Sequence, residues 1–153
     1  MIRASSLAAV VLFALAAMPA AAQETADCDW RAAAANLPEP WESPAVTRTF
    51  ANGEVRLAVL DTIEPAAAAF YLLILSPPRD EVGGRQCRIV GSGGDLGFAG
   101  MSLAGLEASY DAARGLVFLI PVRLMRPEDG TFRGAVLTVS VNQATGAIAA
   151  SVR

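Results

Sequence analysis

The glycine-rich stretch Ile89–Gly97 is the part of the chain most similar to a known functional motif, the phosphate-binding loop. Phosphate-binding loops use glycines so that backbone N–H groups approach the ligand, but the dinucleotide pattern needs glycine where Leu96 stands, followed by a helix. The P-loop pattern needs a lysine, and the chain has none. Ser92 lies in the same stretch, yet no histidine or lysine exists to activate it as a nucleophile. We therefore predict a turn here. Histidine-dependent hydrolases, Ser–Lys enzymes and Schiff-base enzymes are excluded.

Carboxylates offer a second kind of chemistry. Ile63 in Asp61-Thr62-Ile63 replaces the glycine that aspartic proteases need after Asp-Thr, so this tripeptide is no protease motif. A pair of carboxylates brought together in a cleft is able to hydrolyse a glycosidic bond. The acidic residues near the ends of predicted strands are Asp61, Glu64, Glu107 and Asp111. A carboxylate-dependent hydrolase, such as a glycan-acting enzyme, is therefore one alternative, although acidic residues also occur at turns simply because turns are solvated.

Arginines form the third candidate group. Arg56, Arg88 and Arg123 fall within predicted strands, on the face expected to meet solvent. Guanidinium groups placed side by side bind a carboxylate or phosphate through paired hydrogen bonds, so these three are a candidate anion or partner patch. In the alternative interpretation, they form a polar face that discourages edge-to-edge aggregation of the sheet.

Cys28 and Cys87 are the two cysteines of the chain, and we predict that they form a disulfide, as paired cysteines do in exported proteins. The chain has no Cys-X-X-Cys pattern and no histidine, which argues against a redox or zinc site. We predict no cofactor, no metal and no catalytic residue.

From residue 49 onward the pattern is that of short strands joined by turns, many containing glycine or proline. Alternating or continuous apolar runs occupy residues 54–61, 70–75, 85–90, 103–110, 116–123, 134–141 and 147–152. Pro121 lies inside one of these runs and indicates an edge position or a bulge, because proline has no N–H for a sheet ladder.

These runs predict a mainly β fold. We expect an antiparallel meander of about seven strands, either a small open barrel or a curved sheet, over residues 49–153. Residues 23–48 are expected to hold a short N-terminal helix over Trp30–Ala35, capped by Asp27 or Asp29, and then a proline-rich extended segment.

Residues 1–22 are predicted to be a secretory signal peptide. Arg3 supplies a positive start, Leu7–Ala17 is an unbroken apolar run, and Ala20-Ala21-Ala22 supplies the small residues before a cleavage site at Gln23. The apolar run is shorter than the roughly 20 residues that span a bilayer, so we expect no membrane span after signal cleavage.

Charge and composition narrow the function further. Without residues 1–22, eleven arginines face fifteen acidic residues, a formal net charge of −4. Nucleic-acid binding needs a clustered basic surface, so we exclude it. The absence of lysine, with abundant alanine and arginine, is typical of a GC-rich bacterial gene and favours a periplasmic or extracellular location.

Together these observations predict a non-enzymatic periplasmic binding or protein-interaction module. The expected partner is an envelope protein or a small anionic ligand. The alternatives are the carboxylate-dependent hydrolase described above and a structural envelope component.

Overall fold

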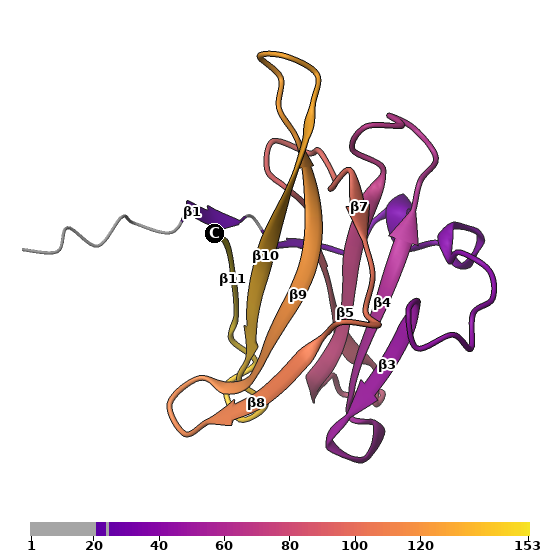
Figure 1. Ribbon diagram of the computed structural model, residues 1–153. Coiled ribbons are helices and arrows are strands. Elements are labelled where there is room, and N and C mark those ends of the chain that lie inside the picture. Colours follow the sequence, from indigo (N-terminus) through magenta and orange to yellow (C-terminus); the bar gives the residue numbers. More distant parts are fainter. Residues whose placement is uncertain (1–20, 24) are drawn as a thin grey trace, which may run out of the picture.

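Two antiparallel sheets pack face to face in the computed structural model, which describes residues 21–23 and 25–153 (Figure 1). Sheet A has the order β1-β11-β10-β9-β7, and β8 also pairs with β9. Its strands are β1 (Ala21–Gln23), β7 (Gly100–Met101), β8 (Glu107–Asp111), β9 (Gly115–Met125), β10 (Phe132–Val141) and β11 (Ile148–Val152). Sheet B has the order β2-β6-β5-β4-β3, from β2 (Thr25–Asp27), β3 (Thr47–Phe50), β4 (Val55–Asp61), β5 (Phe70–Arg79) and β6 (Arg85–Val90).

The main core lies between the two sheets. Side chains alternate across a strand, so every second residue of each long strand points inward. Sheet B contributes residues such as Leu57, Leu72 and Ile74, all at most 1% exposed. Sheet A contributes, among others, Phe118, Ile120, Val122, Leu137, Val139 and Val141.

Both open sides of the sandwich are bridged by the chain. On one side, β1 pairs with β11 of sheet A, and β2 then pairs with β6 of sheet B. On the other side, the Leu103 N–H donates to the carbonyl of Ala45 beside β3 at 2.9 Å. The sheets are therefore held together along both sides, although each keeps its own ladder.

The prediction of a mainly antiparallel β fold is confirmed, but the predicted number of strands is wrong. The described residues contain eleven strands in two sheets instead of about seven in one meander. The extra strands include β1, β2, β3 and β7, which have two to four residues each. In strands this short, the alternation of apolar and polar residues is too brief to detect. They are recognised only by their pairing with neighbouring strands.

The predicted N-terminal helix over Trp30–Ala35 is wrong. Two separate 3-10 turns stand there, η1 (Trp30–Ala32) and η2 (Ala34–Asn36), and Ala33 between them has extended backbone angles (φ −62°, ψ 142°). A third turn, η3 (Ala51–Gly53), precedes β4. Helix nucleation is costly, and a helix-forming run this short, ending before Pro38, does not repay it. Asp29 does cap η1, because its side chain accepts the Arg31 N–H at 2.9 Å.

No helix in the described part of the chain is long and apolar enough to cross a membrane. The predicted signal peptide, residues 1–22, lies outside the described residues except for Ala21 and Ala22. These two residues belong to β1, so the predicted cleavage boundary falls inside a strand.

Candidate functional site

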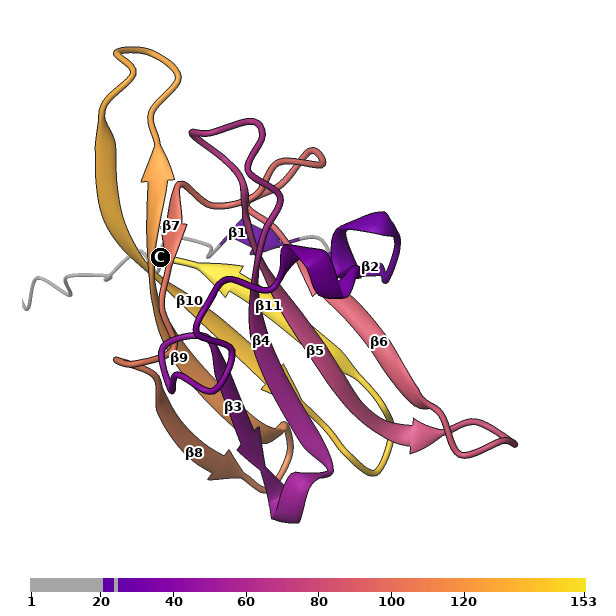
Figure 2. The ribbon, with the colours of Figure 1, turned by 90° about the vertical axis from the view of Figure 1, so that its right-hand side faces the viewer.

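The outer face of sheet B is covered by the chain itself. The segment after β2 crosses this face as η1 and η2 (Figure 2). It packs Cys28, Ala32 and Leu37 on a second, smaller core of Leu60, Tyr71 and Ile89. This face is therefore not free to meet a partner over its central strands.

The disulfide between Cys28 and Cys87 fixes this cover to the sheet. The two Cα atoms are 5.4 Å apart, and the Cys28 N–H donates to the Cys87 carbonyl at 3.3 Å. Cys28 directly follows β2, whereas Cys87 lies within β6. The predicted disulfide is confirmed.

A compact polar cluster completes the cover. The Arg31 guanidinium lies 5.1 Å from the centre of the Tyr71 ring and binds both carboxylate oxygens of Asp29. The Tyr71 hydroxyl donates to the carbonyl of Asp95 at 2.8 Å. Hydrogen bonds from Arg31 lower the pKa of Asp29, and the same contacts raise the pKa of Arg31. The adjoining pocket has room for about 20 Å³, the size of one water molecule, so a substrate does not fit.

Sheet A, in contrast, has no chain segment packed across its outer face among the described residues (Figure 1). Because Phe118, Ile120 and Val122 point into the core, their neighbours along β9 point outward. The same alternation in β10 and β11 leaves eight outward positions without a charge, namely Val117, Leu119, Pro121, Val136, Thr138, Ser140, Ala149 and Ser151.

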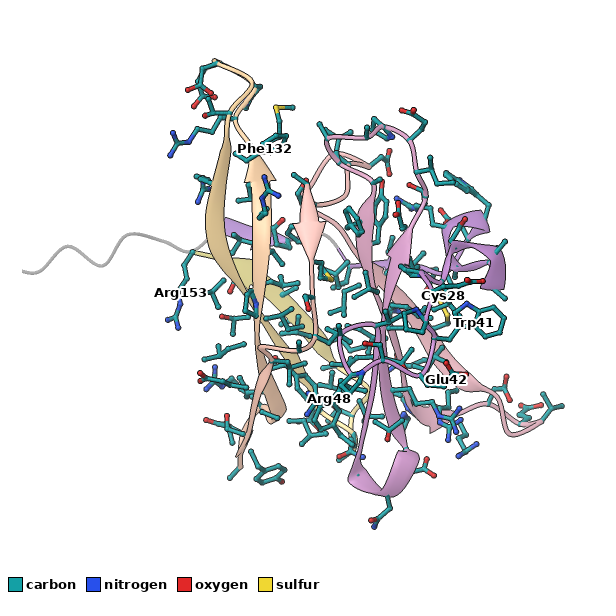
Figure 3. The ribbon with its side chains drawn as sticks, turned by 45° about the vertical axis from the view of Figure 1, so that its right-hand side comes forward. Cys28, Trp41, Glu42, Arg48, Phe132 and Arg153 are labelled. Atoms are coloured by element: carbon teal, nitrogen blue, oxygen red, sulfur yellow. A yellow bond between two sulfur atoms is a disulfide. The ribbon has the colours of Figure 1, made fainter. Side chains whose placement is uncertain are left out.

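Charged groups stand at the borders of this face. A shallow depression contains Leu119, Pro121 and Val136, which we call the apolar strip. Glu107 of β8 borders the depression on one side, and Arg153 borders it on the other. Arg153 is held beside Val136 by two backbone hydrogen bonds of 3.0 and 3.2 Å. Figure 3 shows Arg153 on the sheet A side of the molecule, away from Trp41 and Cys28.

Pro121 occupies a position in β9 where no hydrogen-bond donor is needed. The Arg126 N–H donates to Thr131 just beyond the strand ends, and bonded pairs then alternate along the β9–β10 ladder. This alternation turns the Pro121 nitrogen away from Val136. On that side, β8 pairs with β9 up to Leu119 and β7 pairs from Val122, so Pro121 lies in the gap between the two strands. The predicted edge position agrees with this local arrangement.

Beyond the sandwich, β9 and β10 continue as a two-stranded arm (Figure 1). The Arg123 guanidinium lies 4.9 Å from the centre of the Phe132 ring, and Phe132 is 47% exposed. Arg123 and Pro121 also border a second depression beside Gly100 and Met101. Pro121 is thus the ridge between two hollows on this face.

The three arginines of the predicted patch do not lie together. Register places Arg56 opposite Leu75, and Leu75 opposite Cys87, so Arg56 is on the outer face of sheet B. Arg88 lies one residue out of phase and therefore projects from the other face of the same sheet, where it pairs with Asp27. Arg123 belongs to sheet A. Each is a separate charge, and they form no shared anion site.

The four candidate carboxylates lie in two groups. Asp61 ends β4 and Glu64 lies in the β4–β5 loop, and each accepts a backbone N–H from the residue two positions further along. Glu107 and Asp111 lie on β8, at the opposite end of the sandwich from that loop (Figure 1). Hydrogen bonds from Arg114 lower the pKa of Asp111. Within residues 21–23 and 25–153, no three acidic or cysteine side chains gather closely enough to hold a metal ion.

The glycine-rich stretch is a packed turn. The Ser92 hydroxyl donates to the Gly97 carbonyl at 2.6 Å, and the Gly97 N–H donates to the Ala68 carbonyl at 2.8 Å. A Cβ on Gly97 would lie 2.4 Å from that Ala68 oxygen and 2.5 Å from the Phe70 oxygen. The glycines here allow backbones to approach one another.

Comparison with protein-family models, curated proteins and solved structures finds no match to this chain.

Sequence reasoning missed the outer face of sheet A. A signal for it was present, because β9 is apolar on both faces from Leu116 to Val122 while its partner β10 has small or β-branched residues at every outward position from Gly134 to Ser140. A strand that is apolar on both faces is expected where both faces are covered. Only its inward face is covered by the second sheet.

Proposed function

We propose that this protein is an exported, non-enzymatic interaction module that binds a protein partner on the outer face of sheet A, in the periplasm or outside the cell. The observation that carries the proposal is the apolar strip of Leu119, Pro121 and Val136. It lies on the long strand pair β9–β10, has no covering segment among the described residues, and is bordered by Glu107 and Arg153.

The distribution of charge on this face supports the proposal. Protein interfaces are depleted of charge at their centre and polar at their rim, and uncovered apolar surface marks interaction sites. The uncharged outward positions have this arrangement, with Glu107 and Arg153 beside them; of the eight, Val117 is itself buried at 6% exposure. On the outer face of sheet B, by contrast, η1, η2 and the disulfide cover the apolar cluster of Leu60, Tyr71 and Ile89.

The chemistry of the described residues favours binding over catalysis. The carboxylates that a hydrolase would need are divided between two ends of the sandwich, and the partners of Asp111 favour its charged form over a proton-donating one. A general acid in a glycosidase needs the opposite shift.

The test is crosslinking of the exported protein in its native envelope, followed by purification and mass spectrometry. We expect a stoichiometric protein partner with the wild type and loss of that partner with Val136→Arg, which places a charge in the apolar strip. Val82→Arg is the matched control, because Val82 is 91% exposed on the distant β5–β6 turn. Equal recovery of the same partners by both variants would overturn the proposal.

A further inference from the structure

We propose that the partner seated on the outer face of sheet A is a second copy of this chain, related by a two-fold axis parallel to the strands. This inference rests on the proposed function and names the partner. It is carried by Glu107 and Arg153, which lie on opposite sides of the apolar strip and form a pair that is complementary to itself.

The strip is nearly symmetric about a line between β9 and β10. Pro121 of β9 lies directly opposite Val136 of β10. One strand further out on the β9 side is Glu107, opposite Leu119. One strand further out on the β10 side is Arg153, opposite Val136. The acidic residue and the basic residue are therefore each one strand away from the central β9–β10 pair, on opposite sides.

Within one chain these two charges cannot meet. Three strand spacings of roughly 4.8 Å separate β8 from β11, which puts Glu107 and Arg153 about 14 Å apart across the sheet. Both side chains are exposed, and neither forms an ion pair with any other described residue. Each is thus available to a charge supplied from outside.

A two-fold axis along the strands brings the two borders together. The rotation exchanges β9 with β10, so Pro121 of one copy meets Val136 of the other at the centre. It also exchanges the β8 side with the β11 side, which brings Glu107 of one copy near Arg153 of the other. Their offset along the strands is two residues, about 7 Å, which the two long side chains span. The contact forms twice, as an isologous interface requires.

The surface between these charges suits sheet-to-sheet packing. Its outward residues on β10 and β11 include Thr138, Ser140, Ala149 and Ser151, which are small and uncharged. Two sheets with such faces pack about 10 Å apart with their strands within about 30° of each other. Pro121 of one copy then lies over Val136 of the other, at the depression that Val136 lines together with Leu119.

The decisive experiment exchanges the charges. The mass of the purified exported chain is measured by light scattering and sedimentation velocity up to about 100 µM, a range that detects micromolar association. We expect a dimer for the wild type. Glu107→Arg and Arg153→Glu should each weaken dimerisation by about tenfold or more, because like charges then meet twice per dimer.

An equimolar mixture of the two single variants should restore the dimer, since both contacts of the mixed dimer then join one acidic and one basic side chain. The double variant Glu107→Arg/Arg153→Glu should restore it as well. Both variant positions are exposed, and circular dichroism with a thermal melt verifies that each chain is folded. A mixture no more associated than either variant alone, or a monomeric wild type, would overturn the second copy as partner.

The two proposals can fail separately. A monomeric wild type that still captures an envelope protein, and loses it with Val136→Arg, leaves the interaction face in place and assigns it a different partner. A monomeric wild type whose captured proteins do not depend on Val136 refutes both.

Discussion

The side-chain amide of Gln86 in β6 donates to the carbonyl of Gly146 at 2.9 Å, linking sheet B to the β10–β11 turn of sheet A. The same nitrogen reaches the Ser76 hydroxyl at 3.0 Å and the Pro77 carbonyl at 2.7 Å. Ser76 is fully buried, so this amide supplies a partner that water cannot replace.

Replacing Gln86 with alanine removes that donor. We expect Gln86→Ala to lower the free energy of unfolding by about 2 kcal/mol, because buried oxygen atoms lose their partner. Ser76→Ala is the comparison, since it removes one acceptor and leaves the link to Gly146, and about 1 kcal/mol is expected. Urea unfolding monitored by tryptophan fluorescence measures both. Equal losses in the two variants would show that the Gly146 link contributes nothing.

Loss of the disulfide should be the largest single effect on stability. Cys28 and Cys87 are 59 residues apart, and the chain-entropy relation for a loop of that length gives about 4 kcal/mol. The variant Cys28→Ala/Cys87→Ala should therefore unfold at a much lower urea concentration than the oxidised wild type. The wild type with its disulfide reduced is the control and should match the variant. A variant as stable as the oxidised protein would contradict the prediction.

Gly97 should tolerate no side chain. Alanine there places a Cβ within 2.5 Å of two backbone oxygens, those of Ala68 and Phe70, and overpacking of this kind costs roughly 1–3 kcal/mol. Gly134 is the matched control, because a Cβ at that position meets nothing within 4 Å. We expect Gly97→Ala to lower the melting temperature and Gly134→Ala to leave it unchanged or slightly higher. A larger loss of melting temperature for Gly134→Ala than for Gly97→Ala would show that the backbone around Gly97 moves aside at little cost.

Stability should depend on pH through Asp29. Arg31 lowers the pKa of this carboxylate from its ordinary value of 3.8. Because the pKa is lower in the folded state, the stabilisation is complete at pH values above the ordinary pKa of the carboxylate. It is lost as the pH falls through the pKa of the folded state. The carboxylate is 39% exposed, so the screened contribution is about 0.2–1 kcal/mol.

Asp29→Asn isolates this effect, since asparagine keeps a side-chain oxygen for the cap of η1 but carries no charge. The wild type should exceed the variant in unfolding free energy at pH 6, and the difference should shrink below about pH 4. Urea titrations at each pH measure it. A difference that stays constant down to about pH 2.5 would exclude Asp29 as its source.

Much of the strand pattern can be predicted, because runs of alternating apolar and polar residues end at the same positions as turn residues. The sequence predicts a strand over residues 85–90, and the structure has the same bounds, since Gly84 and Gly91 flank a clean alternation. β5 runs on to Arg79, beyond the predicted end at residue 75, because a register shift between Ser76 and Arg79 accommodates Pro77 and Pro78. Local sequence describes the ladder but not such an irregularity within it.

The candidate surface could not be predicted from the sequence. The alternation of apolar and polar residues indicates whether a side chain points inward or outward, but not which of the two sheets its strand belongs to. Arg56 and Arg123 are both expected to face solvent, and both are exposed, yet they belong to different sheets. Which outer face the N-terminal segment covers depends on where Cys87 lies in sheet B, and thus on long-range pairing.

If the chain is exported as proposed, the pairing of β1 with β11 sets an order for cleavage and folding. Ala22 stands opposite Ser151 in this ladder, and a paired backbone is a poor substrate for a peptidase, which binds its target in an extended, unpaired form. Cleavage at the proposed Ala22–Gln23 bond would therefore have to occur before β11, which follows every other described strand in the chain, reaches its place. Signal cleavage and strand pairing would then compete for residues 21–23, and the faster of the two would decide whether β1 remains to cover the edge of β11.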